Sequence, residues 1–239
     1  MRNRLLRTLA FAVVGATLVT PAASGDGGPS PGVQQGWDGI RSGAVRYVAV
    51  PAGGCRTLLL GQASAGPYLR QHSSFAFVDM KRMRVVNRLR IPGHQVFDAL
   101  SPNGRYLYFV EYVSQQDFTR YRVRVYDLRA EKLRPEAVID KREWETTMQG
   151  SPIARAETEA GWVYTLYGGV HETFIHALDT RNVTAICIDL PWKNVPKRLF
   201  EFRLRLDGEG RLVVRGPHGR VLAAIDRAGH RIVSSVRNP

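Results

Sequence analysis

The stretch YRVRVYDL, residues 121–128, alternates apolar or aromatic residues with charged ones and ends on an Asp and a Leu. Successive side chains of a β-strand point to opposite faces, so Val123 and Val125 would face a core while Arg122 and Arg124 face away from it. An amphipathic helix would instead repeat its apolar residues at three- and four-residue spacings. The stretch therefore predicts a strand in a sheet with one buried face.

Similar short runs, rich in Val, Ile, Leu, Tyr and Phe, follow one another from about residue 44 to residue 236. They are separated by Gly, Pro, Asn and Asp, which favour turns. Helical periodicity is nearly absent; a mild helical pattern occurs only in KREWETTMQG, Lys141–Gly150, which we interpret as an excursion between structural units. The sequence predicts an all-β fold.

Two columns of residues recur through these runs. An apolar run ending in Asp returns at intervals of 48, 52 and 47 residues, and a turn Gly followed by an apolar strand returns at intervals of 50, 57 and 49. The Asp column is Asp79, Asp127, Asp179 and Asp226, and the Gly column is Gly54, Gly104, Gly161 and Gly210. A Gly permits positive φ in a tight hairpin, and an Asp that ends a strand can accept hydrogen bonds from amides of the next turn. Both columns are expected to be structural.

Repeats of 40 to 50 residues with about four strands each are typical of β-propeller blades. We expect four-stranded antiparallel blades over residues of about 44–93, 94–140, 150–192 and 200–236. Four blades are few for a closed propeller, so the sequence indicates either a small ring or an incomplete one. An incomplete ring would expose apolar blade edges and favour self-association.

The segment DALSPNGRYLYFVEY, Asp98–Tyr112, resembles the blade opening of bacterial YVTN/WD40-like β-propeller repeat proteins, particularly secreted actinobacterial ones. The following YRVRVYDLRAEKL is similar to the next strand, turn and strand of such a blade. The resemblance extends over residues of about 44–236 and implies a propeller fold with a binding or scaffold role. Most members of this family have more blades than the four seen here, which leaves ring closure open.

The N-terminus has the features of a secretory signal peptide. Basic residues Arg2, Arg4 and Arg7 precede the apolar run LAFAVVGATLV, and the small residues of TPAASG follow. We expect a signal peptide over residues 1–24, cleaved between Ala22 and Gly25, a flexible Gly/Pro/Ser-rich leader over 25–43, and a propeller-like domain over 44–236. The protein is expected to be secreted or held at the cell surface, with no transmembrane segment after cleavage.

The chain carries 34 Lys and Arg residues against 21 Asp and Glu, a formal net charge of +13. Its densest basic run comprises Arg82, Arg84, Arg88 and Arg90. Scattered basic residues of this kind favour solvated strand faces, and the alternative is a surface for polyanionic ligands of the cell envelope. The expected partner is an unknown protein or such a polyanion, and no specific nucleic acid is indicated.

The two cysteines, Cys55 and Cys187, either form a disulfide that closes a long loop or are two buried thiols. Sequence alone does not place their Cα atoms, and the distance between those atoms decides between the two states. Neither cysteine belongs to a Cys-x-x-Cys pair, so redox catalysis is not indicated.

The segment YGGVHETFIHALDT, residues 167–180, contains a His-Glu pair followed by a second His, as the helical zinc-binding motif His-Glu-x-x-His does. The helical motif needs two His residues four apart on one helix face, whereas His171 and His176 are five apart. On a strand this odd spacing sends the two rings to opposite faces. We therefore expect no metal site here, and no cofactor is indicated elsewhere.

No catalytic motif is assembled in the sequence, and a Gly-x-Ser-x-Gly nucleophile turn is absent. We expect a secreted binding or scaffold protein without catalysis, whose ligand meets the loops at one end of the blades. The alternative is a propeller-type hydrolase or lactonase with loop residues converging on the axis, for which His94, Asp98 and Glu157 are the candidates. Catalytic, cofactor-binding and metal-ligating residues are not assigned.

Overall fold

The computed structural model describes residues 39–42, 45–52, 55–62, 69–79, 82, 84–140, 146–237 and 239, and for residues 39–62 it describes backbone pairing alone. The signal peptide, most of the leader and Gly54 lie outside this part of the chain. Four antiparallel sheets follow one another along the sequence, and the described residues contain no α-helix. The predicted all-β, propeller-like fold is confirmed.

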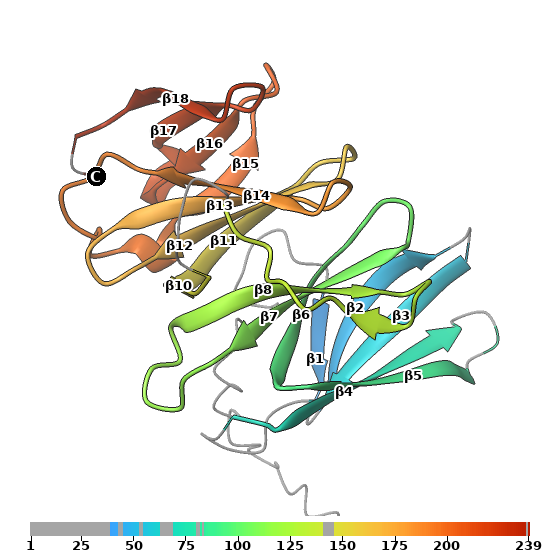
Figure 1. The fold of residues 1–239 in the computed structure, drawn as a ribbon. Helices are drawn as coiled ribbons and strands as arrows, with labels where there is room; N and C mark the ends of the chain where they lie inside the picture. The colour runs from blue at the N-terminus through green and yellow to red at the C-terminus, as the bar shows by residue number, and fades with distance from the viewer. Residues whose placement is uncertain are drawn as a thin grey trace, which may run out of the picture.

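We call the four sheets blades 1 to 4 in sequence order (Figure 1). Blade 1 contains β1 (Gly39–Ser42), β2 (Val45–Ala52), β3 (Cys55–Gln62), β4 (His72–Asp79) and β5 (Arg84–Pro92). Blade 2 contains β6 (His94–Leu100), β7 (Tyr106–Tyr112), β8 (Arg120–Asp127), β9 (Lys132–Leu133) and β10 (Met148–Gln149). Blade 3 contains β11 (Ser151–Glu157), β12 (Trp162–Gly168), β13 (Thr173–Asp179) and β14 (Thr184–Asp189). Blade 4 contains β15 (Arg203–Leu206), β16 (Leu212–Arg215), β17 (Val221–Asp226) and β18 (Arg231–Ser235), with 3-10 helices η1 (Leu199–Glu201) and η2 (Pro217–Gly219) beside it.

The outer strand of blade 2 is interrupted. Both β9 and β10 pair with β8, and an isolated bridge joins Val138 to Val123 between them. A mild helical excursion is expected from the sequence over Lys141–Gly150, but its Met148 and Gln149 form β10 instead. The second sheet therefore extends beyond the unit boundary expected near residue 140.

The blades are held together by three apolar clusters, one between each neighbouring pair. Phe75 of blade 1 packs with Phe109 of blade 2, Tyr108 of blade 2 shares a cluster with Leu178 of blade 3, and Ile175 of blade 3 shares one with Leu204 of blade 4. A single sheet cannot cover its own apolar face, so each blade is stabilised by its neighbours. The core of the protein lies between the blades.

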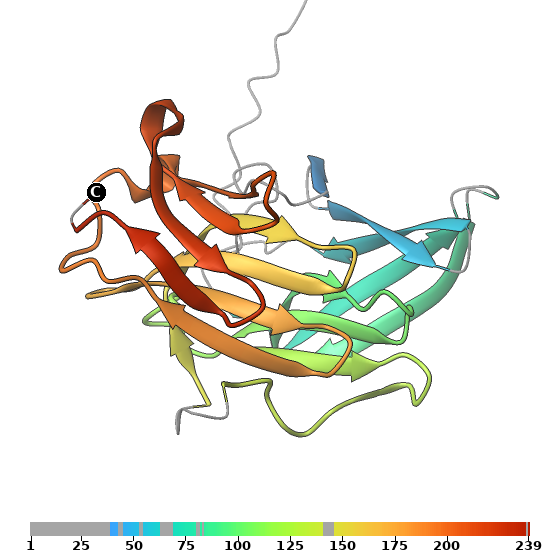
Figure 2. The same cartoon turned by 90° about the horizontal axis from the view of Figure 1, so that it is seen from above.

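Successive blades are rotated relative to one another and form an arc (Figures 1 and 2). Blade 1, drawn in blue to teal, lies at one end of the arc and blade 4, drawn in orange to red, at the other. The described blades do not close into a ring. Within the described residues, no helix is both long and apolar enough to cross a membrane.

Candidate functional site

The four Asp residues of the repeat column each end a strand, which is the fourth of blade 1 and the third of blades 2, 3 and 4. Asp79, Asp127, Asp179 and Asp226 are the last residues of β4, β8, β13 and β17. Each accepts hydrogen bonds from backbone N–H groups two or three residues farther on, as Asp127 Oδ1 does from Arg129 at 3.0 Å and Ala130 at 3.1 Å. These carboxylates order turns, which leaves them a structural rather than a chemical role.

Asp127 also forms an ion pair within blade 2. Its Oδ2 atom accepts hydrogen bonds from Arg105 Nε at 3.1 Å and Nη2 at 2.8 Å. The hydrogen bond from Arg105, aided by the two turn amides, lowers the pKa of Asp127 to about 2. The carboxylate is therefore ionised at neutral pH.

The turn glycines within the described residues, Gly104, Gly161 and Gly210, have φ of 68°, 88° and 74°. Gly161 also lies in a tight contact between blades 2 and 3, because a Cβ atom there would lie 2.8 Å from Pro102 Cγ and 3.0 Å from Thr180 Oγ1. Only a residue without a side chain fits both requirements.

The structure describes the side chain of only one of the two cysteines that could form a disulfide. Cys187 lies in β14 and is partly buried, and its backbone N–H donates to Asp140 Oδ2 at 2.9 Å. Cys55 lies in β3, where only the backbone is described. A disulfide between these two residues stays a prediction.

The residues of the zinc-like stretch lie in two different environments. His171 and Glu172 are exposed in the turn between β12 and β13, and His176 is 2% exposed in β13. Burial lowers the pKa of His176 to about 4, so this ring is neutral at pH 7. Among the described residues, no three His, Cys, Asp or Glu side chains gather around one point that could hold a metal ion.

Of the three residues considered for catalysis at the propeller axis, His94, Asp98 and Glu157, the last two contact the same arginine, which the sequence did not single out. Arg155, in β11 of blade 3, is 2% exposed and contacts Asp98 in β6 of blade 2 and Glu157 in its own strand. Its Nη1 atom lies 2.6 Å from Asp98 Oδ1, and its Nη2 atom lies 2.5 Å from Glu157 Oε1. Burial alone would lower the pKa of Arg155, but the two carboxylates outweigh burial and raise it. The guanidinium is thus a permanent cation.

This ion-pair cluster is poorly suited to acid–base catalysis. A general base needs a lone pair directed at the substrate, whereas Asp98 is 4% exposed and its carboxylate is held by Arg155. His94 stands apart from the pair, buried at the start of β6, where its Nδ1 atom accepts a hydrogen bond from Arg70 N at 3.3 Å. The cluster joins the inner strands of blades 2 and 3.

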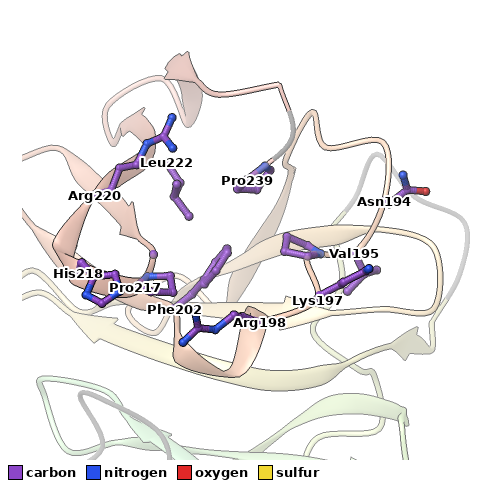
Figure 3. Close-up of a pocket in the computed structure, with 12 residues that line it drawn as sticks. Asn194, Val195, Lys197, Arg198, Phe202, Pro217, His218, Arg220, Leu222 and Pro239 are labelled. Atoms are coloured by element: carbon purple, nitrogen blue, oxygen red, sulfur yellow. The ribbon is translucent and has the colours of Figure 1, made fainter.

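A cleft of about 560 Å³ lies instead beside blade 4 (Figure 3). Two segments form most of its walls, and Pro239 also lines it. The first is the connection from β14 to β15, which turns at Pro196 and enters η1, and the second is the turn between β16 and β17, which contains η2. Backbone hydrogen bonds close both turns, from Leu199 N to Pro196 O at 3.1 Å and from Gly216 N to Arg220 O at 2.9 Å.

The middle of the cleft is apolar. Figure 3 shows the Phe202 ring between Leu222 from β17 on one side and Val195 on the other. Phe202 and Leu222 are nearly buried and form the floor of the cleft. The indole of Trp192 meets Phe202 edge to face, with ring centroids 5.9 Å apart, and Trp192 Nε1 donates to Ser235 Oγ at 3.1 Å. The cleft wall is therefore held by packing against blade 4 rather than by loop residues alone.

The rim of the cleft is basic. Lys197, Arg198, His218 and Arg220 are exposed there, and none of the described side chains that line the cleft is acidic. Arg198 also pairs with Glu201, just behind the rim, through bonds of 2.6 and 2.7 Å. The combination of an apolar floor and cationic rim can hold a ligand that has an apolar part and a negative charge.

His218 adopts an unusual backbone conformation at this rim. Its φ of 61° and ψ of 17° lie in the left-handed region, which costs a non-glycine residue about 1 kcal/mol or more. The conformation directs the chain sharply through Gly216–Gly219 and exposes the imidazole. Glu131, Val183 and His230 have positive φ as well, in turns elsewhere in the protein, so the conformation marks a tight turn and not a binding site by itself.

Comparison with known proteins supports the fold alone. No protein-family model and no curated protein matches the sequence. The Dos1 propeller resembles the chain with 7% sequence identity and a TM-score of 0.50, and the match covers 82% of this chain and 56% of that one. The Kuenenia stuttgartiensis hydrazine synthase has 18% identity and a TM-score of 0.45, and the match covers 74% of this chain and 45% of that one. The β-propeller domain of the Pyrococcus furiosus trilobed protease has 11% identity and a TM-score of 0.44, and the match covers 83% of this chain and 56% of that one. The chain spans about half the length of these structures. The likeness to the Dos1 propeller shows a propeller fold.

Proposed function

We propose that this protein is a non-catalytic binding protein of the propeller fold, and that the cleft beside blade 4 takes a ligand with an apolar body and an anionic group. The observation that carries the proposal is the cleft itself, about 560 Å³ in volume, with Phe202 in its floor and a basic rim. This volume lies within the usual range for small-molecule sites.

The chemistry of the lining favours binding over catalysis. The described residues around the cleft supply one imidazole, from His218, but no Ser, Thr or Cys nucleophile and no Asp or Glu side chain. Acyl or glycosyl transfer needs a nucleophile or an acid–base pair within hydrogen-bonding reach. The cationic rim can instead neutralise a phosphate or carboxylate while the apolar floor covers a hydrocarbon chain.

Isothermal titration calorimetry of the protein with octyl phosphate tests this function. We expect saturable binding of octyl phosphate, and binding of 1-octanol and of inorganic phosphate at least about ten-fold weaker, since each lacks one half of the recognised chemistry. The Arg220→Gln variant should bind octyl phosphate about ten-fold more weakly, because it loses one charge-assisted contact.

The matched control is Arg129→Gln, which removes an exposed arginine of blade 2 that does not line the cleft. This variant should bind octyl phosphate as the wild type does. Equal affinities for octyl phosphate and 1-octanol, or equal losses in the Arg220→Gln and Arg129→Gln variants, would show that the cleft does not recognise an anion.

We further propose that the protein acts outside the cytoplasm, as the basic and apolar N-terminus and the resemblance to secreted YVTN/WD40-like propellers suggest. Expressed in a bacterium with a general secretory pathway, the full chain should appear outside the cytoplasm with a new N-terminus between Ala22 and Gly25. Replacing Val13 and Val14 by Asp in the apolar run should keep it uncleaved and inside. Normal processing of that variant would refute export by a signal peptide.

A further inference from the structure

The turns at one end of blades 2, 3 and 4 are joined by direct contacts. Asp117, in the turn between β7 and β8, accepts a hydrogen bond from Gln149 Nε2 at 2.8 Å. The carbonyl of Gln149 lies against the turn between β12 and β13, because a Cβ atom at Gly169 would be 3.3 Å from it. A Cβ atom at Gly168, the last residue of β12, would be 2.5 Å from Leu199 Cδ2 in η1. These turns form one continuous surface, on the left in Figure 1.

Exposed apolar side chains gather at this end of the blades. Among the described residues, eight large apolar side chains are exposed, and four of them lie in or beside these turns. The four are Val113 after β7, Val170 between β12 and β13, Phe200 in η1 and Val221 at the start of β17. Phe200 is 67% exposed and is the only aromatic residue of the eight. Apolar side chains that collect on one surface, with polar residues around them, mark a contact surface.

The helix η1 holds Phe200 outward. Its neighbours Leu199 and Phe202 are 6% and 2% exposed and pack in the cluster shared by blades 3 and 4. The backbone N–H of Phe202 donates to the carbonyl of Leu199 at 2.9 Å and closes the turn. Phe200 does not line the cleft, although its helix forms part of the cleft wall. The Phe200 ring is therefore presented to solvent by a turn that is anchored in the core.

Four exposed basic residues lie near Phe200, and we call them the blade 4 cations: Lys193, Lys197, Arg220 and Arg237. Lys197 and Arg220 line the cleft, while Lys193 and Arg237 lie within two residues of its lining in the sequence. None of the four forms an ion pair with another residue of the described chain. Their charges are therefore available to an anionic partner.

Acidic residues at this end lie over other blades or are already bound. Glu172 and Asp189 are exposed at blade 3. Asp117 of blade 2 accepts hydrogen bonds from Gln149 and from the backbone N–H of Thr119. The carboxylate of Glu201, next to Phe200, is paired with Arg198 at 2.6 Å. The surplus of positive charge at this end is centred on blade 4.

An exposed aromatic ring among unpaired cations matches the chemistry of an anionic lipid surface. Aromatic side chains are favoured at the boundary between headgroups and acyl chains, where Lys and Arg reach the lipid phosphates. A protein partner would need a packed apolar core of complementary shape. Val113, Val170 and Phe200 instead stand on three separate turns, and a bilayer, which is fluid, accepts such separate apolar tips.

We propose that this end of the blades docks on an anionic lipid bilayer. Phe200 and Val170 enter the boundary between the headgroups and the acyl chains, and the blade 4 cations lie against the lipid phosphates. Neither Phe200 nor Val170 lines the cleft, so this inference does not rest on the proposed function of the cleft.

The test measures partition of the full chain onto lipid vesicles by flotation. The chain carries Val13→Asp and Val14→Asp, so that its apolar N-terminal run is interrupted and does not anchor it. One set of vesicles is phosphatidylcholine, and the other contains phosphatidylglycerol as about one lipid in three. At about 150 mM salt, where exposed charges are screened beyond roughly 8 Å, we expect at least ten-fold stronger partition onto the anionic vesicles. This preference should weaken as salt rises.

The apolar part of the proposal is tested at Phe200. Phe200→Ser should weaken partition onto the anionic vesicles by at least ten-fold, because the inserted ring is lost. The matched control is Leu206→Ser, which removes an exposed apolar side chain of blade 4 at the opposite end of β15 and should change partition by less than two-fold. In vesicles with brominated acyl chains, Phe200→Trp should gain quenched fluorescence relative to the parent chain, and Leu206→Trp should not.

The basic part is tested with two residues that do not line the cleft. Lys193→Gln with Arg237→Gln should weaken partition onto the anionic vesicles by at least five-fold. Arg129→Gln with Arg181→Gln removes the same charge from exposed turns at the opposite end of the blades and should weaken it by less than two-fold. Unchanged thermal unfolding of each variant shows that the fold is retained.

Each other outcome overturns the proposal. Equal partition onto both kinds of vesicle, or onto neither, would exclude an anionic bilayer as the partner. Equal losses in Phe200→Ser and Leu206→Ser would exclude insertion, and equal losses in the two glutamine pairs would reduce the effect to net charge. Binding of inorganic polyphosphate as tight as that of the anionic vesicles, and unaffected by Phe200→Ser, would assign the surface to phosphate polymers.

The cleft and the bilayer surface can be told apart with one variant. Phe200→Ser should bind octyl phosphate as the wild type does, because Phe200 does not line the cleft. Vesicle binding that depends on Phe200 in a protein that does not bind octyl phosphate would refute the cleft function alone. Octyl phosphate binding without partition onto anionic vesicles would refute the bilayer inference alone.

Discussion

We expect the Arg155→Met variant to lose about 3 to 5 kcal/mol of the free energy of unfolding, measured in urea at pH 7. Asp98 is buried between blades 2 and 3, and its carboxylate is bonded to Arg155 at 2.6 Å. Without the guanidinium that carboxylate remains buried with its charge uncompensated. Glu157 contributes less, because its side chain is 52% exposed and water can solvate it.

The double variant Asp98→Asn, Arg155→Met should regain a large part of the loss, because it removes the buried charge together with its partner. The surface control Arg129→Gln should change the free energy of unfolding by less than about 0.5 kcal/mol. An Arg155→Met protein as stable as the wild type would mean that the ion pair does not hold blades 2 and 3 together.

The second large effect is expected at Asp127. Its replacement by Ala should cost about 2 kcal/mol at pH 7, because the Arg105 ion pair and the hydrogen bonds from Arg129 and Ala130 are all lost. Asp127→Asn should cost less, because the amide oxygen can still accept the turn N–H groups. Urea unfolding of the three proteins between pH 7 and pH 2 measures both effects.

The contribution of Asp127 to the free energy of unfolding should decrease as the pH falls. The pKa of Asp127 is about 2 in the folded protein and 3.8 in the unfolded reference, so its ionised form stabilises the fold fully above pH 3.8. This stabilisation is lost as pH falls from 3.8 towards 2, and the gap between wild type and Asp127→Asn should narrow over that window. The equivalent Asp79→Asn change should have a smaller effect at pH 7, because the Arg82 partner of Asp79 is 66% exposed. A gap independent of pH would contradict the ion-pair account.

Strand alternation and the spacing of the Asp residues were sufficient to predict the class of fold. Alternation in residues 121–128 reports which side chains share a face, and the Asp that ends a strand marks the following turn. Both signals come from residues that are close together in the chain, so a single sequence is enough to detect them. The pairing of Met148 and Gln149 with β8 gave no such signal, because a two-residue strand has too little pattern to detect.

The ion pair and the cleft depend on contacts between segments far apart in the sequence. Arg155 stands 57 residues from Asp98 and, in an alternating strand, has the pattern of a solvent-facing residue. Its neighbours Ala154 and Ala156 are small and buried, a faint sign that the strand lies in a crowded part of the fold. The cleft unites residues 194–202 with 216–222, and each segment alone resembles an ordinary basic turn. Local patterns cannot show which turns meet.

The most direct test of the cleft as the binding site is a nuclear magnetic resonance titration of the ¹⁵N-labelled protein with octyl phosphate. We expect saturable shifts of amide signals confined to residues 194–202 and 216–222, with Phe202, Arg220 and Leu222 among those most affected. Shifts centred on Asp98, Arg155 and Glu157, with the cleft residues unmoved, would place the ligand at the axis of the arc and contradict the account.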